Sequence, residues 1–126
     1  MTLVPHSVGL NRPQRQLPPG ACDSHMHIFD PRFAASSHWP RTPPVAPVAA
    51  YRQLQARLGT TRTVVVTPST YGTDNACTLD ALAQLGDAAR GVAVVDGDVS
   101  RDELAHLAAR RVRGRRPGQC RPPRRR

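Results

Sequence analysis

The chain has 126 residues, which is enough for one ordinary domain at most. Its formal net charge of +9 comes from arginine alone, because the sequence contains no lysine. Residues 1–109 hold nine arginines and nine acidic residues, so they carry no net charge and offer no basic face for a nucleic acid; the whole excess lies in residues 110–126.

The cysteines and the first residues of the chain argue against further classes of protein. Cys22, Cys77 and Cys120 are far apart and form no CxxC pair, which argues against a disulfide scaffold and against a zinc finger. The first 20 residues contain no apolar run long enough for a signal peptide or a membrane span. We therefore expect a cytoplasmic, reduced protein in which residues 1–17 form a loose arm.

The first half of the chain predicts a strand, a long loop and a helix. Residues 21–29 predict a strand that ends before an Asp-Pro pair. Residues 30–49 contain five prolines, which rule out a helix or a central strand and predict a loop. A loop of that length is usually a functional lid or a disordered insert. Residues 49–59 repeat apolar residues with a helical period and end at a glycine, so they predict a helix.

The second half repeats the alternation of short apolar runs and helical patterns. The expected order is strand, helix, strand, helix and the start of a fourth strand, at residues 62–69, 77–86, 90–97, 100–111 and 112–114. The second of these helices opens with a capping box formed by Ser100 and Glu103.

This β-α-β-α-β-α-β order predicts an α/β fold with a parallel sheet wrapped by helices. The strands are continuous apolar runs, which is typical of parallel strands buried on both faces. The pattern fits either an open doubly wound sheet or a segment of a (β/α)8 barrel. No glycine-rich phosphate fingerprint is present, so nucleotide binding has no support.

Two histidines one residue apart are the first candidate for chemistry. Alternation along a strand puts Asp23, His25 and His27 on one face, near the end of the strand where α/β active sites are built. Two imidazoles at this spacing can converge on one metal ion or one anionic group. The residues alone leave a second interpretation open, namely partly buried histidines bonded to backbone carbonyls.

The turn after the Val-rich strand is the second candidate. Ser69 and Tyr71 carry hydroxyls at the same edge of the predicted sheet, and we expect them to contact substrate. Asp74 or Asn75 is expected to cap the following helix. Asp96 is expected to serve a turn rather than a site.

With these residues in place, the chain resembles the amidohydrolase superfamily, and within it the group that contains 2-pyrone-4,6-dicarboxylate hydrolase. The resemblance covers residues 18–114 and rests on three stretches: CDSHMHIFDPRF, PPVAPVAAYRQLQARLGTTRTVVVTPSTYGTDN and RGVAVVDGDVS. It implies a (β/α)8 TIM barrel that hydrolyses a lactone, ester or amide bond by attack of an activated water.

The resemblance also implies roles for four residues. His25 and His27 are implied as catalytic residues that bind a divalent metal (zinc or manganese), or that polarise the lactone carbonyl where the enzyme is metal-independent. Ser69 and Tyr71 are implied as contacts for the carboxylates of a small acidic lactone or carboxylate substrate.

The chain departs from the family after residue 114, where family members continue with further strands of the barrel. A complete barrel needs about 250 residues and, in this family, supplies a third histidine and a general-base aspartate that this chain lacks. We therefore expect residues 18–114 to form three to four β/α units of a truncated barrel. As an isolated polypeptide such a unit is expected to be poorly folded and inactive.

Residues 115–126 are almost entirely arginine, proline and glycine, which have G/C-rich codons. We interpret them as an out-of-frame reading of a GC-rich gene that begins near Gly114. The rival hypothesis for the whole chain is a nucleic-acid-binding protein that acts through this arginine-rich segment. We consider nucleic acid an unlikely partner, because the segment has no aromatic residues for base stacking.

Overall fold

The structure is a computed structural model that describes residues 9–118. Residues 1–8 of the expected arm and residues 119–126 of the arginine-rich segment, Cys120 among them, lie outside the described residues. Residues 9–17 contain no helix or strand.

Strands and helices alternate along the described chain as the sequence predicts. Their order is β1 (Cys22–Met26), α1 (Val48–Leu58), β2 (Arg62–Val66), α2 (Ala76–Leu85), β3 (Ala89–Val95), α3 (Arg101–Ala109) and β4 (Val112–Pro117). Short 3-10 turns follow β2 and α2, namely η1 (Ser69–Tyr71) and η2 (Gly86–Ala88).

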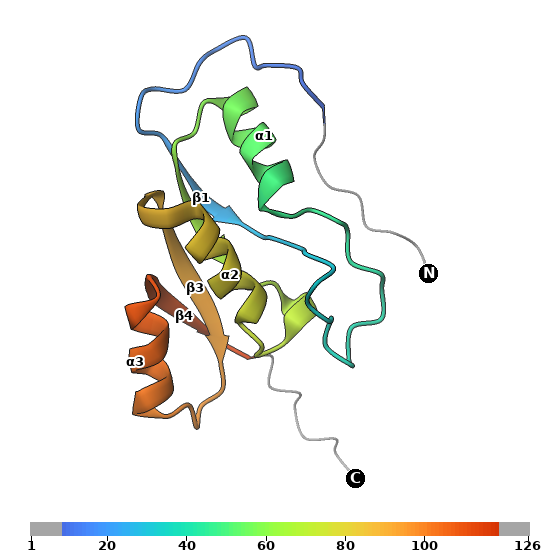
Figure 1. Cartoon of the computed structure of the whole chain (residues 1–126), viewed down its shortest axis with the longest axis vertical. Helices are drawn as coiled ribbons and strands as arrows, with labels where there is room; N and C mark the ends of the chain where they lie inside the picture. The colour runs from blue at the N-terminus through green and yellow to red at the C-terminus, as the bar shows by residue number, and fades with distance from the viewer. Residues whose placement is uncertain (1–8, 119–126) are drawn as a thin grey trace.

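All of the strand pairs are parallel, and the strand order in the sheet is β1-β2-β3-β4. A doubly wound sheet would reverse its strand order at a switch point, whereas a (β/α)8 barrel adds each new strand on the same side. The order therefore selects the barrel alternative. Because crossovers between parallel strands are right-handed, a uniform order puts all three helices on one face of the sheet, with α2 between α1 and α3 (Figure 1).

The core lies between this sheet face and the helices. Val65 of β2, Ala93 of β3 and Leu82 of α2 are at most 1% exposed and belong to one cluster. Gly91 of β3 lets α2 approach closely, since a Cβ atom there would lie 2.7 Å from Cδ1 of Leu82. A larger residue there would require the buried Leu82 side chain to shift.

The helix ends follow local chemistry. α1 ends at Gly59, whose φ of 83° is the left-handed conformation that glycine adopts without strain. At the start of α3 the hydroxyl of Ser100 accepts the Glu103 N–H at 3.0 Å, as expected for the first bond of a capping box.

β1 ends earlier than the sequence predicts, and it contains an irregularity. Asp23 pairs with Thr63 but Met26 pairs with Val65, so two residues of β1 oppose one residue of β2. The expectation that Asp23 shares a face with the histidines is wrong for this reason: its carboxylate accepts the hydroxyl of Tyr51 on α1 at 3.0 Å.

β4 begins at Val112, as expected, and runs to Pro117. The domain boundary expected at residue 114 falls inside this strand, where Arg116 lies opposite Val94 of β3. Across residues 9–118, none of the helices is both long and apolar enough to cross a membrane.

The side chain of Asn75 joins the second and third β/α units. It occupies the N-cap position of α2, but it makes no capping bond; instead its Oδ1 accepts the Val94 N–H and its Nδ2 donates to the Val94 carbonyl, both at 2.9 Å. Oδ1 also accepts the hydroxyl of Thr67 at 2.8 Å. The capping bond comes from Asp74, whose carboxylate accepts the Ala76 N–H.

We predict that Asn75→Ala lowers the free energy of unfolding by about 2–3 kcal/mol, because it leaves the buried N–H and carbonyl of Val94 without the side-chain partners they have now. Asp74→Ala is the matched control and should cost about 1 kcal/mol or less, since it removes one exposed capping bond. Urea denaturation of both variants measures the difference. Equal losses would contradict the assignment of Asn75 to the sheet.

Candidate active site

A cavity of about 390 Å³ opens at the carboxyl ends of the strands, on the sheet face opposite the helices. Three segments contribute its lining: the end of β1, the loop before α1 and the turn after β2, with one residue from β4. The lining residues are His25, His27, Phe29, Trp39, Arg41, Pro44, Val66, Pro68, Ser69, Thr70 and Arg116. This end of a barrel is where the βα loops form active sites.

His25 and His27 lie together at the mouth of this cavity. Their ring centroids are 5.1 Å apart and the rings meet edge to face. His27 Nδ1 is 2.8 Å from the carbonyl oxygen of Val66, the last residue of β2. Since a carbonyl only accepts, Nδ1 carries the proton, and Nε2 of a neutral His27 keeps its lone pair.

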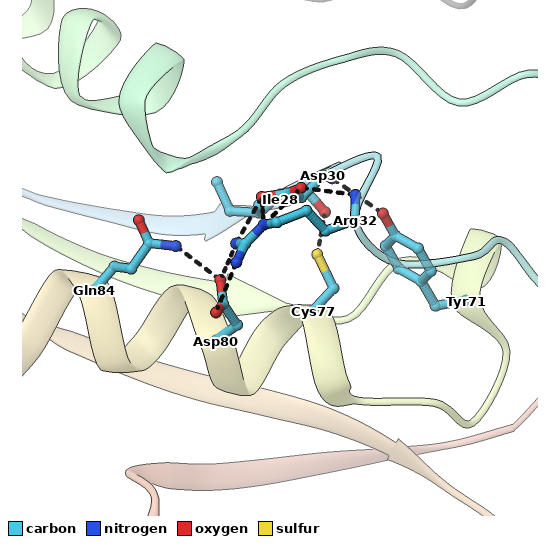
Figure 2. Close-up of polar contacts among 7 residues, drawn as sticks. All are labelled: Ile28, Asp30, Arg32, Tyr71, Cys77, Asp80 and Gln84. Atoms are coloured by element: carbon cyan, nitrogen blue, oxygen red, sulfur yellow. Dashed lines mark hydrogen bonds and ion pairs between the residues drawn. The ribbon is translucent and has the colours of Figure 1, made fainter.

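The structure brings Ser69 to the cavity but not Tyr71. Ser69 is half-buried in the lining, whereas the Tyr71 side chain is buried and its hydroxyl accepts the Asp30 N–H at 3.2 Å (Figure 2). Burial raises the pKa of the Tyr71 hydroxyl, and the neighbouring Cys77 thiol raises it further. Successive residues of a 3-10 turn point about 120° apart, so Ser69 and Tyr71 do not share a direction.

Two arginines that the sequence did not single out also line the cavity. Arg116 reaches across from β4, and its Nη2 donates to the Thr67 carbonyl at 2.9 Å. Its Nε is buried and makes no hydrogen bond within residues 9–118. Arg41, from the long loop, is exposed and also lines the cavity. The lining therefore contains two guanidinium groups and no carboxylate, which gives the cavity a positive potential.

The sequence gives no local signal for Arg116. Alternation from Val112 puts Arg116 on the same face as Val112, which packs in the core, whereas the register shift near the start of β4 moves Arg116 to the face of Val94. The boundary drawn at residue 114 assigned it instead to the arginine-rich segment.

The histidine pair fits a metal only as part of a larger ligand set. Among residues 9–118, no group of three His, Cys, Asp or Glu side chains is close enough to hold a metal ion. The bond from His27 Nδ1 to a backbone carbonyl is typical of a metal-binding histidine, since it orients Nε2. A metal here would take two imidazoles and complete its shell with other donors.

Known proteins resemble this chain over most of its length. The chain matches the model of the amidohydrolase family over residues 22–121. It is 40% identical to 2-pyrone-4,6-dicarboxylate hydrolase of Comamonas testosteroni, over 82% of the chain and 35% of that protein. It is 37% identical to 4-sulfomuconolactone hydrolase of Rhizobium radiobacter, over 78% of the chain and 33% of that protein.

A solved structure supports the fold. The chain superimposes with a TM-score of 0.71 on a probable 2-pyrone-4,6-dicarboxylic acid hydrolase of Acinetobacter baumannii with citric acid bound, at 28% identity, over 76% of this chain and 36% of that one. The chain thus spans about a third of the length of the curated relatives it matches. With the family match, the parallel strand order and the cavity at the strand ends in agreement, the chain belongs to the amidohydrolase family, and its strands and helices are β/α units of that family's TIM barrel.

Proposed function

We propose that the cavity is the substrate-binding side of a hydrolase site that opens a small acidic lactone by attack of water on its carbonyl carbon. The observation that carries the proposal is a histidine pair flanked by two arginines in a cavity whose lining has no carboxylate. The names of the relatives, which are lactone hydrolases, support the same substrate class.

Substrate binding would begin with the arginines. A guanidinium presents paired N–H groups that match a carboxylate, and such charge-assisted bonds are stronger than neutral ones. Arg116 is held in place by its bond to the Thr67 carbonyl, so little of its side-chain freedom remains to be lost on binding. Arg41 and the hydroxyl of Ser69 would contact the rest of the acidic substrate.

The histidines would act on the lactone carbonyl. As water adds to the carbonyl carbon, negative charge develops on the carbonyl oxygen, and an imidazole N–H beside that oxygen stabilises it. His25 would supply this N–H as a neutral ring, whereas His27, whose Nδ1 proton is bonded to the Val66 carbonyl, would supply it from Nε2 only as the imidazolium. Collapse of the tetrahedral intermediate breaks the ring C–O bond and gives a carboxylate and a hydroxyl. The edge-to-face packing of His25 on His27 keeps both rings at the same end of the cavity.

A divalent metal, zinc or manganese, is an alternative use of the same pair. His25 and His27 would be its ligands from this chain, and a bound metal would supply a water of lowered pKa. Titration with zinc chloride or manganese chloride tests the metal form. Binding that disappears in His27→Ala supports the metal form, and absence of binding shows that the two histidines of this chain do not hold a metal without further ligands.

Among the described residues, the cavity offers several groups that could bind a substrate but fewer that could catalyse its hydrolysis. No carboxylate is among the described residues that line the cavity, and the two imidazoles are already used on the lactone carbonyl in this proposal, so no separate general base is present there to take the proton of water. We therefore propose that this chain on its own binds ligand without turnover. Hydrolysis of 2-pyrone-4,6-dicarboxylate by the purified chain would contradict that proposal.

The partner we propose is a small acidic molecule, and we propose a cytoplasmic location, where such metabolites are found. We propose no nucleic-acid function. Arg113 and Arg116 both donate to backbone carbonyls of the fold, at 2.7 Å and 2.9 Å, so part of the basic C-terminal region has a structural use.

We predict that His27→Ala weakens binding of 2-pyrone-4,6-dicarboxylate roughly tenfold, because it removes the hydrogen bond that Nε2 of a protonated His27 would donate to the anionic ligand, and a bond to a charged group is worth about that factor. His106→Ala, an exposed histidine of α3, is the control and should bind normally. Trp39 is the single tryptophan of the chain and lines the cavity, so quenching of its fluorescence measures binding. Failure of the parent chain to bind would contradict the proposed function.

We predict that Arg116→Gln weakens citrate binding by about 10- to 100-fold and flattens the dependence of affinity on sodium chloride, since a charge-assisted contact is lost. Citrate is a suitable probe because it is bound in the related crystal structure. Arg113→Gln is the matched control: it removes the same charge from β4, but its guanidinium contacts the Ala108 and Val112 carbonyls. Equal losses in the two variants would show a general charge effect and no specific site.

A further inference from the structure

We propose that Arg32 is a positioning residue of the cavity: it ties the first part of the loop of residues 30–45 to α2 and so fixes the loop wall that carries Trp39 and Arg41. The placing of the loop stands on contacts alone. Its consequence for ligand binding rests on the proposed function.

The two ends of the loop are hydrogen-bonded to each other, and its middle part lines the cavity. Phe29 and Ala46 form an antiparallel bridge, with N–H to carbonyl distances of 3.1 Å and 2.9 Å. Between them, Ser36 donates its N–H to the Thr70 carbonyl at 2.8 Å, and Trp39 donates to the Ser36 carbonyl at 2.9 Å. The loop backbone thus leads directly from its anchored part to the cavity wall.

Arg32 lies between two carboxylates from different elements (Figure 2). Its Nη2 is 2.8 Å from Oδ2 of Asp30, in the loop, and 2.6 Å from Oδ2 of Asp80, on α2. Its Nε donates to both oxygens of Asp30 at 3.1 Å. Asp80 is held in turn by Gln84 one helical turn on, whose Nε2 donates at 2.7 Å.

An isolated surface ion pair would contribute little, and the Arg32 side chain is more than half exposed. Asp30 changes this balance, because its side chain is only 10% exposed. Hydrogen bonds from Arg32 lower the pKa of the Asp30 carboxyl against the opposing effect of burial. Removal of Arg32 would therefore leave a largely buried carboxylate without its counter-ion, and the loop would have to open to hydrate it.

A second set of contacts fixes the same segment from the same helix. The thiol of Cys77 lies 3.6 Å from the Ile28 carbonyl, and Cys77 and Asp80 are three residues apart, on one face of α2. The Asp30 N–H donates to the buried Tyr71 hydroxyl. Arg32 is the most exposed part of this arrangement, so it can be replaced without opening the core.

The test compares Arg32→Ala with the parent chain by two readouts of loop position. We expect trypsin to cut after Arg41 roughly tenfold faster, since cleavage follows the population of the open loop, and we expect the Trp39 emission to shift to the red. Arg32→Lys, which can keep one of the two ion pairs, should lie between the two. Unchanged cleavage and emission in Arg32→Ala would overturn the proposal.

Two comparisons separate positioning from general destabilisation. Cleavage after Arg90 in β3 is measured in the same digests; a parallel rise there would mean global unfolding and would overturn the proposal. Arg111→Ala breaks an ion pair of the same kind, with Asp87 at 3.0 Å, away from the loop, and should leave the Arg41 cleavage rate unchanged. Asp80→Asn, which keeps the Asp30 pair, should give a smaller effect than Arg32→Ala.

Citrate titration of the same variants connects the loop to the cavity. Weaker binding in Arg32→Ala, with normal binding in Arg111→Ala, supports the full proposal. If no variant binds citrate, the parent included, the proposed function fails, while the cleavage and emission data still decide whether Arg32 positions the loop.

Discussion

The extra residue in β1 determines which side chains of this segment face the cavity and which face the helices. Regular alternation would put Asp23 and the two histidines on one face, and a carboxylate would then lie beside the imidazoles. Because the register shifts between Asp23 and Met26, Asp23 instead meets Tyr51 under α1, while Met26 still enters the core. His25 and His27 are left alone on the cavity side.

This separation explains the sign of the cavity's charge. Asp23 shares the Tyr51 hydroxyl with Thr63, and burial raises the pKa of that hydroxyl to about 12, so the group stays protonated and keeps donating. The carboxylate closest in sequence to the histidines is thus used to join α1 to the sheet. The cavity keeps only cationic and neutral groups, which suits an anionic ligand.

The sequence predicts the order of elements well, because each depends on a local period. Three consecutive valines, leucines spaced by three residues or a Ser100–Glu103 pair carry their own structural information. The sequence does not predict the roles of Tyr71, Asn75 and Arg116, because these roles depend on contacts and geometry that only the folded chain creates. The sequence does not distinguish Tyr71 from Ser69, whose directions differ because of the 3-10 turn, and the N-cap position of Asn75 does not reveal its hydrogen bonds to β3. Arg116 was obscured by composition, since one arginine among many gives no local signal.

The backbone of the strand ends explains why these particular side chains are fixed. Where parallel strands end, their last carbonyls lose the ladder and need other donors. The Val66 carbonyl accepts a hydrogen bond from His27, the Thr67 carbonyl accepts one from Arg116, and the Val94 carbonyl accepts one from the amide of Asn75. Each donor is fixed because leaving a buried carbonyl without a partner is costly. Two of the three donors line the cavity, so the same hydrogen bonds that complete the sheet also hold an imidazole and a guanidinium in the cavity wall. In this chain the same hydrogen bonds therefore stabilise the strand ends and fix the geometry of the candidate site. A substitution that breaks one of these bonds should affect both.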